Sequence, residues 1–149
     1  MLRLTIAALA TAALAVAEGF TFTIGSPVAS QDFHFKGAVF VFRTEGCPGS
    51  AKPLLSATAE GIVNGERRSV ALNVMPASKP GVYGIYQSWP AQGHWVVNLK
   101  GTCGSSSAGA VVPVGPKGFI RESSKFFARP ATESEIESSL RELGQAGKQ

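Results

Sequence analysis

Hydrophobic and polar residues alternate in short runs along most of the chain, which is the pattern of β-strands with one buried face. Residues 20–24 read Phe-Thr-Phe-Thr-Ile, and residues 55–59 alternate in the same way. Residues 33–42 form an aromatic and β-branched run that becomes apolar on both faces near its end. We therefore expect this strand to be covered on both sides, by a loop or by the C-terminal segment. A last apolar strand is predicted at residues 108–114.

Turn residues predict how some of these strands pair. Asn64-Gly65 separates two alternating runs, and this dipeptide favours a two-residue hairpin because both positions take positive φ. Residues 82–89 and 93–102 are expected to form a second hairpin across the short loop between them. Together these signals predict about seven short strands in a two-sheet antiparallel sandwich. The expected fold class is therefore all-β.

The N-terminal segment has a different character. Arg3 precedes an apolar run at residues 4–14, and Ala15-Val16-Ala17 forms a small-x-small site before Glu18. This order is typical of a secretory signal peptide rather than of a buried helix. The run is too short to cross a bilayer, which takes about 20 apolar residues. We therefore expect an exported protein, periplasmic or secreted, with no integral membrane segment after signal cleavage.

The C-terminal segment predicts a short helix. Residues 132–135 read Thr-Glu-Ser-Glu, a capping box with Thr132 at the N-cap. Ile136, Leu140 and Leu143 then recur at helical spacing, and Gly144 is expected to end the helix. A one-sided helix of about 12 residues is marginal alone. It must therefore dock, either on its own sandwich or on a partner.

Length and charge bound the organisation further. Removing the signal peptide leaves roughly 130 residues, enough for one domain with a core. We divide the chain into a signal peptide at 1–17, a β-sandwich at 19–129, and a helix with its tail at 130–149. The formal net charge is +4, with basic residues scattered among acidic ones. Binding to a nucleic acid needs lysine and arginine residues clustered on one face, so no nucleic-acid partner is expected. We also expect the protein to be a monomer.

Cys47 and Cys103 are the only two cysteines. Exported proteins meet oxidising conditions, so a disulfide between them is the first hypothesis. It would close a loop of 56 residues. Constraining a loop of that size in the unfolded chain stabilises a protein by about 4 kcal/mol. Two free thiols or a thiolate metal site are the alternatives.

Residues 80–103 carry a resemblance to a known fold. Pro80-Gly81-Val82-Tyr83, Trp89-Pro90 and the segment from Gly93 to Leu99 resemble the late hairpin of bacterial immunoglobulin-like domains, and among these the YtkA/FixH-like group of exported proteins. The resemblance implies an immunoglobulin-like sandwich. The mature chain is also similar to a group of exported bacterial proteins with no assigned activity. The matching segments are 32–37, 44–47, 64–69 and 121–127.

The resemblance to YtkA/FixH-like proteins implies copper handling or oxidase assembly. It makes His34, His94 and Met75 candidate ligands beside the two cysteines, because thiolate, thioether and imidazole groups suit Cu(I). The sequence has no Cys-x-x-Cys or His-x-His motif and no methionine cluster. A periplasmic copper-handling accessory protein is therefore the alternative hypothesis, and the main hypothesis includes no cofactor.

Signals of catalysis are weak. Serines at 105–107 lie in a glycine-flanked turn, and no Gly-x-Ser-x-Gly motif occurs. A hydrolase would need His94 to lie near a serine and a carboxylate. We therefore expect a non-catalytic protein.

Recognition is the remaining class of function. Residues 121–129 mix charged and aromatic side chains after the last strand. We interpret Phe119, Ile120, Phe126 and Phe127 as a cover over the sandwich. Alternatively, Phe126 and Phe127 form an exposed patch for a protein or glycan partner, which an exposed Trp89 would strengthen. The main hypothesis is an exported binding or structural module.

Overall fold

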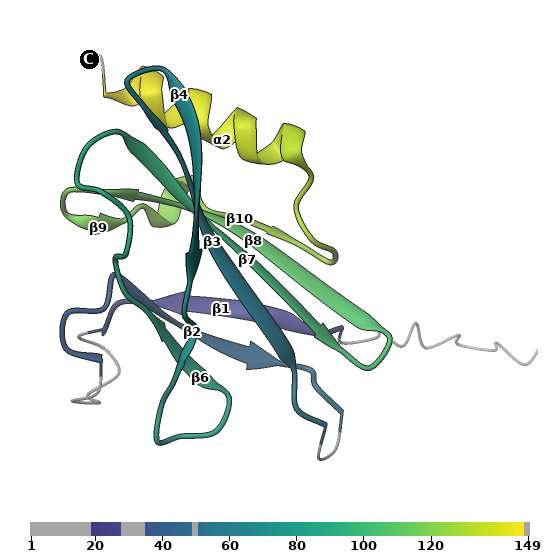
Figure 1. Cartoon of the computed structure of the whole chain (residues 1–149). Coiled ribbons are helices and arrows are strands. Elements are labelled where there is room, and N and C mark those ends of the chain that lie inside the picture. The colour runs from purple at the N-terminus through teal and green to yellow at the C-terminus, as the bar shows by residue number, and fades with distance from the viewer. Residues whose placement is uncertain (1–18, 28–34, 49–50, 148–149) are drawn as a thin grey trace, which may run out of the picture.

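The structure is a computed structural model that describes residues 19–27, 35–48 and 51–147, and its strands form two antiparallel sheets packed face to face (Figure 1). The first sheet contains, in spatial order, β1 (Thr21–Gly25), β2 (Phe40–Glu45), β6 (Val82–Ile85) and β5 (Met75–Pro76). The second contains β10 (Lys125–Phe127), β8 (Ser106–Gly115), β7 (His94–Cys103), β3 (Leu54–Val63) and β4 (Glu66–Leu72), with β9 (Gly118–Phe119) paired to β8. The predicted all-β sandwich is confirmed, with three very short strands beyond the seven expected.

The core between the sheets is built from alternate residues of the long strands. On the first sheet, Phe22 makes edge-to-face contacts with Phe20 and Phe42, each with ring centroids 5.5 Å apart. On the second sheet, Val97 and Leu99 of β7 are buried against them. Aromatic pairs of this geometry add to the stability that burial of their area provides.

The disulfide closes one end of the sandwich. Cys47 follows β2 in the first sheet and Cys103 ends β7 in the second, with their Cα atoms 5.7 Å apart. The predicted Cys47–Cys103 bond is confirmed. The two sulfur atoms are therefore bonded to each other, and the alternatives of free thiols or a thiolate metal site are wrong.

The first predicted hairpin is also confirmed. β3 and β4 pair in antiparallel register, with Val63 opposite Glu66 across the turn. Asn64 and Gly65 take φ values of 50° and 79°. Both central residues therefore adopt the left-handed conformation that the Asn-Gly dipeptide predicts.

The second predicted hairpin is wrong. β6 pairs with β2 and β5 in the first sheet, whereas β7 pairs with β3 and β8 in the second. Residues 95–99 of β7 are all buried, so this strand needs long neighbouring strands on both sides. The four-residue β6 is too short to provide one. The segment between β6 and β7 instead crosses from one sheet to the other. It carries Trp89 into the core.

The strand expected at residues 33–42 begins only at Phe40. Phe35 lies in a turn and packs on the outer face of the first sheet, where a Cβ at Gly84 would lie 2.5 Å from the Phe35 ring. Val41, opposite Gly84 in the register, is buried beneath this loop. Cover on both faces is therefore confirmed, and the loop provides it. His34 lies outside the described residues.

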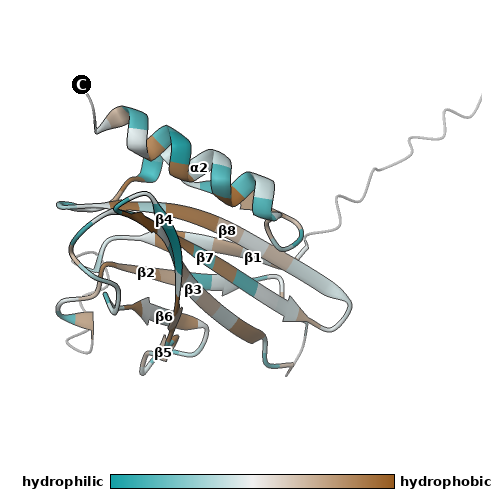
Figure 2. Cartoon of the chain, turned by 45° about the horizontal axis from the view of Figure 1, so that its top comes forward, coloured by the Kyte–Doolittle hydropathy of each residue, from teal (hydrophilic) through white to brown (hydrophobic). Residues whose placement is uncertain are grey.

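One helix, α2 (Glu133–Ala146), covers the outer face of the second sheet (Figure 2). Its buried residues Ile136 and Leu140 pack on Val96 of β7 and Val111 of β8. The predicted capping box is confirmed. The Thr132 hydroxyl accepts a hydrogen bond from the Glu135 backbone N–H, and the Glu135 carboxylate accepts one from the Thr132 backbone N–H. The helix thus docks on its own sandwich.

Gly144 does not end the helix, contrary to the prediction. The helix continues to Ala146 and is capped at Gly147. Glycine inside a helix costs about 1 kcal/mol relative to alanine. Packing of the neighbouring Leu143 against the sheet offsets that cost, so tertiary contacts override the local preference.

Candidate functional site

A large hollow of about 1390 Å³ lies at the end of the sandwich opposite the disulfide. β7 links the two ends, since it begins at His94 beside the hollow and ends at Cys103. Among the described residues, separate stretches of the chain line the hollow, within residues 26–27, 35–39, 87–95, 114–120 and 143–147. Figure 1 shows β9 and the C-terminal end of α2 at this end of the molecule, away from the β7–β8 hairpin.

The floor of the hollow is aromatic. Trp95 of β7 and Trp89 of the crossing segment are both buried, with ring centroids 6.5 Å apart. The Trp95 indole N–H donates to the Gln92 carbonyl at 2.8 Å, which holds the ring in place and satisfies its polar group. The two buried rings, with Trp95 held by its hydrogen bond, make an apolar base for a bound molecule.

The walls are apolar and half-buried. Val39 directly precedes β2 of the first sheet, Phe119 comes from β9, and Leu143 from α2. The Phe119 ring lies 5.9 Å from that of Phe40, so the core supports this wall. The guanidinium group of Arg121 lies 5.5 Å from the centre of the Phe119 ring. Three elements far apart in sequence therefore build one apolar enclosure.

The charged side chains that line the hollow are all basic within the described ranges. They are Lys36, Lys117 and the ionisable His94, all exposed. His94 lies beside the last turn of α2, where a Cβ at Gly147 would be 3.5 Å from the imidazole Cε1. The free carbonyl groups of a helix C-terminus carry partial negative charge. The hollow therefore combines apolar walls with two lysines on its rim.

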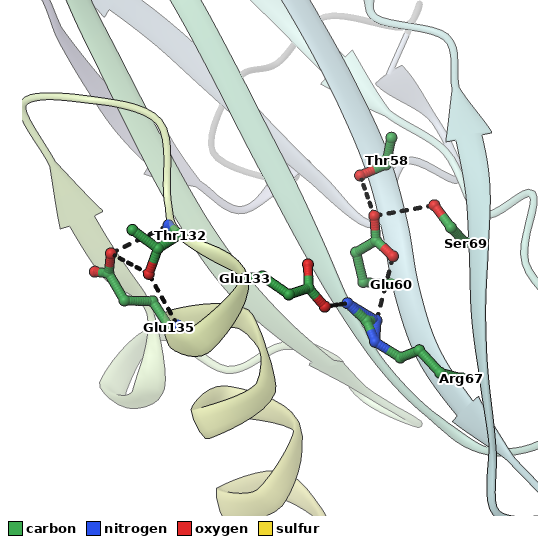
Figure 3. Close-up of polar contacts among 7 residues, drawn as sticks. All are labelled: Thr58, Glu60, Arg67, Ser69, Thr132, Glu133 and Glu135. Atoms are coloured by element: carbon green, nitrogen blue, oxygen red, sulfur yellow. Dashed lines mark hydrogen bonds and ion pairs between the residues drawn. The ribbon is translucent and has the colours of Figure 1, made fainter.

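A polar cluster ties the N-terminal end of α2 to the β3–β4 hairpin (Figure 3). One Glu60 oxygen accepts from Thr58 at 2.8 Å and from Ser69 at 3.0 Å. Arg67 donates to the other Glu60 oxygen at 3.3 Å and to Glu133 of the helix at 2.5 Å. Each charged group has a partner within the cluster, so we interpret it as a structural tie.

Two further ion pairs fix the helix along its length. Arg129 contacts Glu135 at 2.6 Å, and Lys125 of β10 contacts Glu142 at 3.0 Å. The hydrogen bond from Arg129, together with those from Thr132, lowers the pKa of Glu135 to about 2. These contacts fix where the last turn of the helix, with Leu143, borders the hollow.

The structure does not bring the copper candidates together. Both cysteines are in the disulfide, Met75 lies at the edge of the first sheet, and His94 lies in the second. In the described ranges no three His, Cys, Asp or Glu residues are grouped as metal ligands. His34 was the third candidate, and its position is not described. Ser105 lies in the β7–β8 turn, and Ser106 and Ser107 begin β8, at the other end of β7 from His94.

The recognition candidates separate into different places. Trp89, considered as an exposed residue, is only 7% exposed and contributes to the hollow instead. Phe127 is half-buried beside α2, with the Arg129 guanidinium 5.0 Å from its ring centre. Phe126 is 52% exposed, so its predicted role as a cover is wrong. Because neighbouring residues of a strand face opposite ways, Phe126 and Phe127 lie on opposite faces of the edge strand β10.

Comparison with known proteins found no matching family model, no matching curated protein and no matching solved structure. Within the part of the chain that the structure describes, α2 is too short and too polar to cross a membrane, and no other helix qualifies.

Proposed function

We propose that the protein is a non-catalytic, exported binding module, and that the hollow between the sheets and α2 is its binding site. The observation that supports this most is an open hollow of about 1390 Å³ with both tryptophans of the chain at its base. Ligand sites in proteins are concave, mainly apolar and few in number. The hollow has this character.

The arrangement favours an apolar ligand over a glycan. Sugar rings stack on exposed aromatic faces, whereas Trp89 and Trp95 are 7% and 3% exposed. The side chains that remain accessible around them include Val39, Phe119 and Leu143. Contact with an apolar chain would remove these half-buried groups from water, at about 25 cal/mol for each Å² of apolar surface buried.

Export is supported by two independent features. Disulfides persist in oxidising compartments, and Cys47 and Cys103 form one. Residues 1–17 have the sequence pattern of a signal peptide and lie outside the described residues. The proposed module therefore works outside the cytoplasm, in the periplasm or beyond the cell.

A fluorescence titration tests the binding site. Both tryptophans contribute to the floor, so their emission reports occupancy without a label. We expect added decanol, a neutral apolar probe, to change the emission along a saturable curve. Ala91→Phe places bulk at an exposed position of the lining and should weaken the binding. Ala128→Phe, at an exposed position outside the lining, is the matched control.

The two variants separate the outcomes. Saturable binding that Ala91→Phe weakens and Ala128→Phe leaves unchanged supports the proposal. No saturable change, or equal weakening by both variants, shows that the hollow is not the binding site. Circular dichroism of each variant establishes that the fold is retained before the comparison is made.

A further inference from the structure

We propose that the hollow takes an acidic amphiphile, a single apolar chain that ends in a carboxylate, and that Lys36 and Lys117 bind the carboxylate. This inference rests on the proposed function, because it names the ligand class of the same site. It is carried by the charge of the rim together with the apolar walls.

The two lysines come from opposite sides of the hollow. Lys36 belongs to the loop that covers the first sheet, and Lys117 to the turn between β8 and β9 in the second. Within the described ranges neither ammonium group takes part in an ion pair. Arg121, above the Phe119 wall, adds a third basic side chain close by. A carboxylate at the mouth would gain charge-assisted hydrogen bonds that these lysines do not make to the protein.

Four basic side chains elsewhere on the protein are neutralised by acidic partners. Arg43, Arg67, Lys125 and Arg129 each contact a glutamate. Around the hollow the lining includes no aspartate or glutamate within the described ranges. Among the described residues of the lining, no acidic side chain neutralises the two lysines, so this part of the rim is complementary to an anionic ligand.

His94 is assigned no part in binding the anion. It borders the hollow, but its imidazole ring also lies beside Gly144 and Gly147 at the C-terminal end of α2. The partial negative charge of the helix C-terminus lies on that side of the rim. We therefore assign the carboxylate to Lys36 and Lys117 and not to His94.

The apolar part of the ligand follows from the shape of the enclosure. Val39, Phe119 and Leu143 line a concavity and are half-buried in it. Such walls enclose one free molecule, whereas docking on a bilayer requires apolar groups that project outward. The occupant we infer is accordingly a free long-chain carboxylate and not a lipid within a membrane.

Three probes with the same decyl chain test the inference: decanoate, decanol and decyltrimethylammonium, each titrated below the concentration at which it forms micelles. Tryptophan emission again reports occupancy. We expect decanoate to bind about tenfold more tightly than decanol, which corresponds to about 1.4 kcal/mol, because its carboxylate makes charge-assisted contacts with the lysines. The cation should bind most weakly. Added salt should weaken decanoate binding and leave decanol binding unchanged.

Charge-neutralising variants locate the effect. Lys36→Gln and Lys117→Gln should each reduce the preference for decanoate over decanol several-fold, and the double variant should abolish it. Lys100→Gln is the matched control, since Lys100 is an exposed lysine of β7 outside the lining. The preference of the Lys100→Gln variant for decanoate over decanol should equal that of the unchanged protein.

Each outcome points to one conclusion. Equal affinity for decanoate and decanol overturns the acidic ligand and leaves the apolar binding site standing. Failure of every probe to bind overturns the proposed function as well. A peptide of alternating leucine and glutamate that binds more tightly than decanoate would reassign the hollow to a peptide segment and so overturn the inference.

Discussion

The rings of Trp89 and Trp95 lie 6.5 Å apart, one on the segment that crosses between the sheets and the other on β7. This contact joins the two sheets at the end of the sandwich that has no disulfide. It also forms the floor of the hollow. Packing and the proposed binding therefore depend on the same two side chains.

Gly61 of β3 makes room for Trp95, and the first prediction concerns this contact. A Cβ at Gly61 would overlap the six-membered part of the indole ring. Gly61→Ala should therefore lower the free energy of unfolding by about 1–3 kcal/mol, the usual cost of overpacking a core. Gly25→Ala is the control, because a Cβ there would meet only a methyl group of Val41 at 4.0 Å. Urea denaturation of both variants tests the prediction, and equal stabilities would contradict it.

The second prediction concerns the disulfide. Replacing Cys47 and Cys103 together with serine removes a cross-link between residues 56 apart in sequence. The free energy of unfolding should fall by about 4 kcal/mol, mainly because the unfolded chain gains freedom. The hollow lies at the other end of β7, so decanol affinity of the folded variant should be unchanged. A loss of affinity without unfolding would contradict this separation of the two ends.

Docking of α2 yields a third prediction about which contacts stabilise it. Leu140 is 2% exposed in the contact with the sheet, so Leu140→Ala should cost about 2–5 kcal/mol. Arg67→Gln breaks the ion pairs of the exposed cluster and should cost at most about 1 kcal/mol. Thermal unfolding of the two variants compares them. A larger effect of Arg67→Gln would show that the polar tie dominates the docking.

A fourth prediction comes from two buried polar atoms. The Asn98 side-chain oxygen and the Ser139 hydroxyl are buried, and neither finds a hydrogen-bond partner within the described residues. Ser139→Ala removes one such group and improves helix propensity, so it should raise the free energy of unfolding by about 1 kcal/mol. Ser138→Ala changes propensity at the neighbouring, more exposed position and should have a smaller effect. Destabilisation by Ser139→Ala would contradict the assignment of an unsatisfied hydroxyl.

The lowered pKa of Glu135 predicts how the stability of the protein depends on pH. The hydrogen bond from Arg129 lowers the pKa of Glu135 from 4.5 to about 2. A group whose pKa is lower in the folded state stabilises the protein above its unfolded pKa, and this contribution is lost as the pH falls. Stability should therefore decrease between pH 4.5 and about 2. Glu135→Gln should make this decrease smaller in denaturation curves recorded across that range, whereas the exposed Glu137→Gln should not.

Local patterns predicted much of the fold because local chemistry determines those features. Asn64-Gly65 specified its turn, the residues around Thr132 specified the helix start, and the cysteines had only one possible intramolecular partner. Such signals depend on a few adjacent residues or on simple counting. These features can therefore be predicted without knowledge of the tertiary structure.

Features that depend on tertiary packing were not predictable. The pairing of residues 82–89 with 93–102 was wrong because burial of β7 on both faces, and not turn spacing, determines its neighbours. The hollow is assembled from separate stretches of the described chain, and no short motif marks any of them. Lys36 and Lys117 are isolated lysines in the sequence and acquire a common role only when the sheets pack.

The most direct test of the account is a nuclear magnetic resonance titration of the full mature protein with decanol. The chain has two tryptophans and therefore two indole N–H signals, from the floor of the hollow. We predict that both signals shift along one saturable curve, while the methyl signals of Leu54 do not. Leu54 is the matched apolar control, since it is 77% exposed and pairs with Thr102 near the disulfide. Unshifted indole signals, or equal shifts at Leu54, would contradict a binding site in the hollow.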